Sequence, residues 1–115
     1  MLLILAIPYV MNIEEVTAYC LSKPNVTSGF PFRKETLVFK AGEKVFCLLR
    51  LDQFPPTINI KCDPEEAVEL REKYPAITPG YHMDKKHWNT IVLDGSLKDR
   101  HIKNFIDKSY QLVNK

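Results

Sequence analysis

The middle of the chain constrains its fold most, because short extended runs follow one another with only turn residues between them. Four runs are rich in apolar, β-branched and aromatic residues: Val26–Phe32, Thr36–Phe39, Lys44–Leu51 and Thr57–Cys62. Ala41-Gly42-Glu43 is typical of a hairpin turn, and the prolines of Asp52–Pro56 keep that segment out of a strand ladder. Strands joined by such short links run antiparallel. The segment predicts a four-stranded antiparallel meander in which Ile58, Ile60 and Cys62 share one face.

Two helices are predicted on either side of this meander. The first runs from Ile13 to Ser22, where apolar residues recur at helical spacing, and Asn12 and Glu15 form a capping box at its start. The second begins after Asp63, a favourable N-cap followed by proline and two glutamates, and ends before Pro75.

The last third of the chain predicts two more strands and a third helix. Ile77–Met83 contains a loop and a short strand, and Trp88–Leu93 is a strand in which we expect Trp88 to be a core residue. The third helix is expected to begin at Ser96. Its apolar stripe is Ile102, Phe105, Ile106, Ser109 and Val113. Because helices and strands do not alternate, we expect an α+β two-layer sandwich with the helices packed on one face of an antiparallel sheet.

The first ten residues stand apart from this pattern. The apolar stretch 1–10 is too short to span a bilayer, which needs ~20 residues, and it lacks the basic start of a signal peptide. We expect Met11 to be the natural start and residues 1–10 to be an upstream extension. An added edge strand and a signal anchor are the alternatives. Residues 11–115 are expected to form one domain, a size that folds without a metal or disulfide.

Charge and cysteine usage narrow the function classes. The net charge is +2, and the part from Tyr81 onward holds seven Lys/Arg against four Asp/Glu. Cys20, Cys47 and Cys62 form no C-x-x-C pair, which favours three reduced core thiols in a cytoplasmic protein. The chain contains no nucleophile elbow, P-loop or dinucleotide-binding glycine motif. We therefore expect a protein that is not an enzyme and uses no cofactor.

Three histidines are the only candidates for a metal site. His82 and His87 are five residues apart, and His101 could join them, but their spacing follows no metal-ligand rule. The sequence therefore favours a protein without a bound metal.

One segment, residues 79–90, combines lysines, histidines and aromatic residues and reads P-G-Y-H-M-D-K-K-H-W-N-T. It resembles the signature of the MmcQ/YjbR family, and Ser109-Tyr110 and Asp63-Pro64-Glu65 match other parts of that family's pattern. Asp84 departs from it, since the family usually has asparagine there. The resemblance extends from Met11 to Lys115. It implies a CyaY-like fold described as a double-wing DNA-binding arrangement, and it carries over no catalytic residue.

Two functions from different classes follow. The first is weak, largely sequence-independent binding of double-stranded DNA by a monomer that does not contact membranes. Its phosphate contacts would come from two hairpin wings and nearby basic residues: Lys40, Lys44, Lys85, Lys86, His87, Arg33, Lys34 and Arg50. The second is an interaction domain that binds a protein or small ligand on the exposed face of the sheet. Iron handling, by analogy with frataxin, is a third possibility that would rest on Glu14 and Glu15 alone.

Overall fold

The computed structural model describes residues 11–81 and 83–114. The segment 1–10, for which we expected an upstream extension, lies outside the described residues. Within the described ranges the elements are α1 (Ile13–Leu21), β1 (Val26–Gly29), β2 (Thr36–Ala41), β3 (Lys44–Arg50), β4 (Thr57–Lys61), α2 (Pro64–Lys73), β5 (Ile77–Pro79), β6 (Trp88–Val92) and α3 (Asp99–Val113).

The strands form one antiparallel sheet in the order β1-β2-β3-β4-β6-β5. The first four strands are the predicted meander. The last hairpin then joins its far edge with β6, rather than β5, beside β4. One row of cross-strand partners runs through five strands, as Leu37, Leu49, Ile58, Ile91 and Ile77. This row faces the helices and forms the centre of the core.

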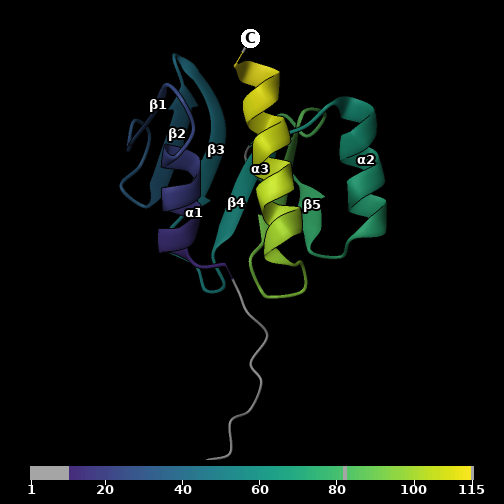
Figure 1. Ribbon diagram of the computed structural model, residues 1–115. Coiled ribbons are helices and arrows are strands. Elements are labelled where there is room, and N and C mark those ends of the chain that lie inside the picture. The colour runs from purple at the N-terminus through teal and green to yellow at the C-terminus, as the bar shows by residue number, and fades with distance from the viewer. Residues whose placement is uncertain (1–10, 82, 115) are drawn as a thin grey trace, which may run out of the picture.

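The three helices of the described chain lie on the same face of the sheet (Figure 1). Helix α3 crosses β3 and β4 at the centre, α1 packs near β1, and α2 packs near β5 and β6. The predicted α+β sandwich is therefore confirmed. No helix in the described part of the chain is long and apolar enough to cross a membrane.

The hydrogen bonds of Ser109 explain why this polar residue stands in the apolar stripe of α3. Its side chain is buried, donates to the Phe46 carbonyl at 2.5 Å and accepts the Lys61 N–H at 2.9 Å. Phe46 lies where the pairing of β2 and β3 shifts register, so the ladder leaves a carbonyl without its regular partner there. The serine hydroxyl thus joins α3 to both central strands.

Local signals placed most helix ends correctly. Asn12 and Glu15 form the predicted capping box, with the Glu15 N–H 2.8 Å from Asn12 Oδ1. Asp63 stands at the N-cap of α2, but its side chain makes no capping hydrogen bond. The expected start of the third helix at Ser96 is wrong. Ser96 donates from its N–H and its hydroxyl to Asp94 Oδ1, so it belongs to the preceding turn and α3 begins at Asp99.

The expectation that Trp88 is a core residue is also wrong. Trp88 is half-buried and pairs with Lys61 at the end of the β4–β6 ladder. Strand residues alternate between faces, and Ile91 faces the helices, so Trp88 lies with Thr90 on the opposite face. The apolar run Trp88–Leu93 predicts a strand, but it does not show which face of that strand the helices cover.

Candidate binding surface on the open sheet face

The eight basic residues expected to contact DNA lie at two opposite ends of the sheet. Lys44 stands at the β2–β3 turn, and Lys85, Lys86 and His87 precede β6. These turns share one end because the β2–β3 ladder closes at Lys44 and the β4–β6 ladder begins at Trp88. Lys40 lies on β2 near this end. The connection 33–35 and Arg50 lie at the other end, where Arg50 pairs with Thr57. The structure therefore does not bring the predicted residues together as one surface.

Several groups in the Lys85–His87 turn are engaged within the protein. Lys85 Nζ donates to the Gly80 carbonyl at 3.2 Å, and the Lys85 carbonyl accepts from Arg71 Nη1 at 2.9 Å. His87 Nδ1 lies 2.6 Å from Asp84 Oδ2, and this hydrogen bond is the main cause that lowers the pKa of Asp84. Asp84 therefore anchors the turn and places a negative charge beside its basic groups.

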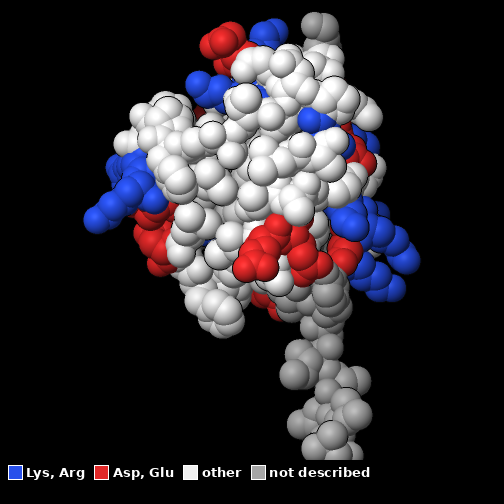
Figure 2. Space-filling view, turned by 60° about the vertical axis from the view of Figure 1, so that its left-hand side comes forward, with Lys and Arg blue, Asp and Glu red and all other residues white. Residues whose placement is uncertain are grey.

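Basic and acidic side chains are mixed at this end of the sheet. Lys40, Lys44, Lys61, Lys85 and Lys86 stand there with Arg71, and the carboxylates are Glu43, Asp63, Glu65, Glu66 and Asp84. Interspersed charges of both signs weaken the attraction for a polyanion. On the face drawn in Figure 2, Lys and Arg side chains stand in separate groups, with Asp and Glu between them and a wide uncharged area.

The face of the sheet opposite the helices carries its own buried row. Val38, Leu48, Asn59 and Thr90 are cross-strand neighbours on β2, β3, β4 and β6, and all four are buried. Val38 and Leu48 do not belong to the cluster packed under the helices. We call this surface the open face. It is covered only in part, by the connection before β2 and by the segment that follows β5.

The segment after β5 approaches β6 very closely before it turns over the open face. The Gly80 N–H donates to the Trp88 carbonyl at 2.9 Å, and a Cβ on Gly80 would lie only 2.8 Å from the Trp88 Cβ. The next residue, Tyr81, donates its backbone N–H to Thr90 Oγ1 at 3.0 Å. Only glycine fits at this position, and it allows Tyr81 and Met83 to reach over the sheet.

These two segments and the strands enclose a hollow of about 350 Å³ on the open face. It is lined by Phe32, Arg33, Glu35, Thr36, Leu48, Arg50, Asn59, Tyr81 and Met83. Pockets of this size accept small ligands, for which the usual range is ~300–1,000 Å³. Phe32 and Tyr81 are 67% and 54% exposed, which is unusual for aromatic side chains that line a concave surface.

Asn59 is the polar residue on the floor of this hollow, and it is only 4% exposed. Thr90 Oγ1 accepts the Tyr81 N–H, and its own proton points to Asn59 Oδ1 at 2.5 Å. This chain of bonds fixes the amide with its oxygen toward Thr90. Within residues 11–81 and 83–114, no acceptor for Asn59 Nδ2 is present. The hollow therefore contains an oriented, nearly buried donor that is available to a ligand.

Two arginines stand at the wall of the hollow, each beside a carboxylate. Arg50 donates from Nε and Nη2 to the two oxygens of Asp52 at 3.2 and 3.0 Å, and its guanidinium lies 5.4 Å from the centre of the Tyr81 ring. The hydrogen bond from Arg50 lowers the pKa of Asp52. Arg33 Nη1 lies 4.0 Å from Glu35 Oε1. Nη1 of Arg50 is not used by Asp52, so it adds a second donor group at the hollow.

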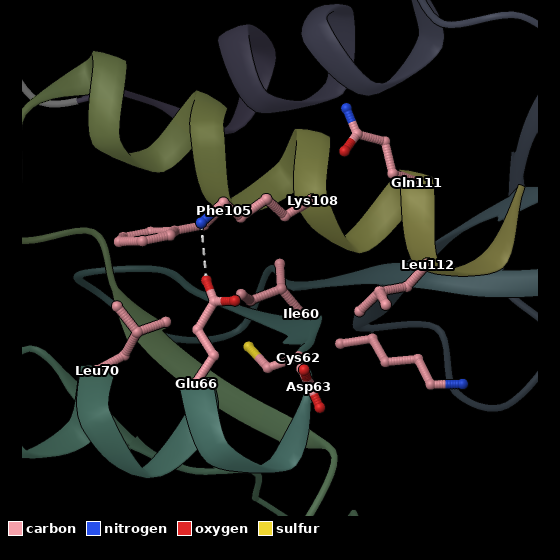
Figure 3. Close-up of a pocket in the computed structure, with 10 residues that line it drawn as sticks. Ile60, Cys62, Asp63, Glu66, Leu70, Phe105, Lys108, Gln111 and Leu112 are labelled. Atoms are coloured by element: carbon pink, nitrogen blue, oxygen red, sulfur yellow. Dashed lines mark hydrogen bonds and ion pairs between the residues drawn. The ribbon is translucent and has the colours of Figure 1, made fainter.

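A second hollow, about 300 Å³ in volume, lies between α2, α3 and the end of β4 (Figure 3). Lys108 Nζ donates to Glu66 Oε1 at 2.9 Å across it, with Leu70 and Phe105 alongside. Burial raises the pKa of the Cys62 thiol to about 11, so this thiol stays protonated at neutral pH. The ion pair between Lys108 and Glu66 spans this hollow, so a ligand that entered it would have to separate or bypass these two charges.

The two described histidines that were considered as metal ligands, His87 and His101, each have a partner of their own. His87 bonds to Asp84, and the His101 ring lies 6.1 Å from that of Tyr74, while His82 lies outside the described residues. In the part of the chain that the structure describes, no three His, Cys, Asp or Glu side chains are grouped so that they could hold a metal ion.

The fold and the open face together define a class of small α+β proteins with three helices on one side of an antiparallel sheet and an accessible other side. The YjbR family model matches residues 21–112, and the chain belongs to this family. It is 33% identical to Escherichia coli K12 YjbR over 88% of this chain and 86% of that one. It is 36% identical to YbdF of E. coli O157:H7 over 87% and 82% of the two chains.

Solved structures show the same fold. The Deinococcus radiodurans protein DR2400, of domain class DUF419, superposes with a TM-score of 0.88 at 37% identity, covering 96% of this chain and 83% of that one. A Pseudomonas syringae protein gives a TM-score of 0.78 at 31% identity, covering 90% and 99% of the two chains. The names of these proteins state no ligand or reaction, so the comparisons establish family and fold.

The sequence prediction missed the residues that line the open-face hollow. Tyr81, which is half exposed, and Met83 both line the hollow, although neither was among the predicted site residues. Asn59 carried a usable signal: it alternates with Ile58 and Ile60, which placed it on the face opposite the core. The sequence contained no signal that the connection carrying Phe32 would fold back over that face.

Proposed function

We propose that this chain is a non-enzymatic binding module that takes a small ligand on its open sheet face. The observation that supports this most directly is the donor group of Asn59. It is nearly buried, oriented by Thr90, and lies on the floor of a hollow with accessible aromatic walls. A ligand acceptor that bonds to this donor would replace its contact with water, and such a hydrogen bond contributes ~0.5–1.5 kcal/mol net.

The family signature adds support to this location. Tyr81 and Met83 belong to the 79–90 segment and line one wall of the hollow, and Gly80 of the same segment lies close against Trp88. The three unpaired, buried thiols suit a module that acts in the reducing cytoplasm, and we propose that it acts there as a monomer.

A fragment screen by two-dimensional NMR tests the proposal. ¹⁵N-labelled protein is mixed with a library of small polar and apolar fragments, and the amide shifts are mapped onto the structure. We expect the perturbed amides to cluster around Leu48, Asn59 and Tyr81. Clustering in the hollow between α2 and α3, or on the lysine-bearing turns, would contradict the proposed location.

A matched pair of variants sharpens this test. Phe32→Ala removes an exposed aromatic wall of the hollow, whereas Phe54→Ala removes an aromatic ring that is 97% exposed and does not line it. Neither change empties the core, so both variants should keep the melting temperature of the parent. Fragment binding should weaken in Phe32→Ala and stay unchanged in Phe54→Ala.

Binding of double-stranded DNA is a second candidate. It is supported by one observation, that Lys44 at the start of β3 and Lys85–Lys86 before β6 lie at the same end of the sheet, with β4 between those two strands. These lysine-bearing turns could contact roughly four to six phosphates, for which the log–log slope of affinity against salt is roughly −4 to −5. Lys85→Ala/Lys86→Ala should then reduce the size of that slope by about two.

Fluorescence anisotropy with a DNA duplex at several salt concentrations measures the salt dependence of affinity, both for the parent protein and for the double variant. The mixture of basic and acidic side chains at this end predicts weak binding, with dissociation constants on the order of micromolar even at low salt. Binding that the double substitution leaves unaffected would remove this candidate, and so would the absence of binding at low salt.

A further inference from the structure

We infer that the ligand of the open-face hollow is a small aromatic carboxylate. This inference rests on the proposed function, because it names the ligand of the same site. It follows from three features of the hollow: its apolar walls, the kind of hydrogen-bonding groups it leaves available, and its charge.

The walls are suited to a planar apolar group. Phe32 and Tyr81 expose much of their rings, Leu48 contributes to the floor, and Met83 adds a flexible thioether that packs well against rings. The volume of about 350 Å³ lies at the small end of the range for ligand pockets. One aromatic ring with a short substituent matches this size.

The available polar groups are donors. Asn59 lines the hollow with its amide oxygen bonded to Thr90, which leaves Nδ2 as its available donor, and Nη1 of Arg50 is not used by Asp52. The substituent on the ring must therefore present acceptors. An ammonium group has only N–H donors, so it could not form a hydrogen bond with either of these groups. A carboxylate can accept from both of them at once.

The charge of the hollow favours one negative charge over two. Arg33 and Arg50 are matched by Glu35 and Asp52, which lie 4.0 Å and 3.0 Å from their guanidinium nitrogens. A phosphate monoester, with a charge of about −1.5 to −2 at neutral pH, would be repelled by both carboxylates. A single carboxylate adds less charge and still takes two hydrogen bonds.

Three probes of nearly equal shape test the inference: 3-phenylpropionate, 3-phenylpropionamide and 3-phenylpropylamine. Each is titrated into ¹⁵N-labelled protein, and inorganic phosphate serves as an anion without a ring. The side-chain amide signals of Asn59 report directly on the proposed donor. We expect 3-phenylpropionate to shift these signals with a dissociation constant on the order of millimolar, which is usual for so small a ligand. The amide should bind about tenfold more weakly, because it lacks the charged acceptor.

Two variants separate the contributions of the ring and the carboxylate. Phe32→Ala should weaken all three probes, with Phe54→Ala as the unaffected control. Asn59→Asp keeps an acceptor for the Thr90 hydroxyl but replaces the donor with a negative charge, so it should abolish selectivity for the carboxylate. If this variant is unfolded, the order of affinity of the three probes for the parent protein decides the question.

The outcomes distinguish this inference from the proposed function. If the neutral amide or the amine binds in the hollow as tightly as the carboxylate, the inference is wrong while the site stands. Phosphate binding there as tightly as 3-phenylpropionate would equally overturn it. If no probe shifts the Asn59 signals and the fragment screen also finds nothing at the hollow, both the inference and the proposed function fail.

Discussion

Replacing Gly80 by alanine should destabilise the protein and distort the open face. The new Cβ would lie 2.8 Å from the Trp88 Cβ and 3.0 Å from the Trp88 carbonyl oxygen, whereas carbon atoms in contact stand ~3.5–4.0 Å apart. Neither obstacle can rotate away, because one belongs to the backbone and the other is fixed to it. The edge of the sheet must therefore move, and Tyr81, which follows directly, must move with it.

The expected cost of this substitution combines two effects. Overpacking costs ~1–3 kcal/mol, and the reduced freedom of the unfolded chain gives back ~0.4–1 kcal/mol. The net loss is about 1–2 kcal/mol. For a chain of 115 residues each kcal/mol lowers the melting temperature by about 4 °C, so a decrease of about 4–8 °C is expected.

Thermal unfolding followed by circular dichroism measures this decrease, and Gly29→Ala is the matched control. A Cβ on Gly29, in β1, would have no atom within 4 Å, so that variant should be as stable as the parent or slightly more stable. Gly80→Ala should also weaken binding of 3-phenylpropionate. Equal melting temperatures for the two variants would refute the steric argument.

Three further predictions concern the core and its titrating groups. Ser109→Ala leaves one backbone N–H and one carbonyl of the central strands without their partner. The free energy of unfolding, measured with urea, should fall by about 2–4 kcal/mol. A decrease below ~1 kcal/mol would contradict this role of Ser109. Burial and the hydrogen bond to Asp107 raise the pKa of Tyr19 to about 12. The stability that comes from this shift is complete below pH ~10 and is lost as the pH rises through about 12, and an ultraviolet titration should show one late-ionising tyrosine that Tyr19→Phe removes. A hydrogen bond to a second thiol and burial raise the pKa of Cys47, which is fully buried, so a thiol reagent should modify Cys47 only as fast as the protein unfolds. Cys62 borders the second hollow, but burial raises its pKa to about 11, so it should react slowly. Rapid labelling of Cys47 in the folded protein would show that this thiol is accessible.

The elements that were predicted well depend on neighbours in the chain. The capping box of α1 needs only Asn12 and Glu15, and the β2–β3 hairpin needs only two extended runs and a turn at Gly42. The start of α3 was misplaced although it is local, because Ser96 has two competing uses. Its hydroxyl could cap a helix, but Asp94 offers it a closer partner within the preceding turn.

The candidate site was predicted less well, because its residues come from four separate segments. Lysine-rich turns are visible in a sequence, and they suggested a site where the structure shows basic and acidic side chains mixed together. Asn59 was placed on the correct face by alternation alone, but the hollow that it lines also needs Phe32 and Tyr81, which come from separate connections of the chain. Whether an apolar residue such as Trp88 meets the helices or the open face depends in the same way on which side the helices pack.

The sequence by itself determined the order of the elements, the antiparallel meander and the family signature, since these follow from local hydrogen bonding, period-two alternation and a contiguous motif. The tertiary structure decided that β6 pairs with β4 and leaves β5 at the edge. That pairing joins residues about 30 positions apart, such as Asn59 and Thr90, and it is selected by burial of Ile91 under the helices rather than by any local preference. The oriented donor of Asn59 exists because of that choice.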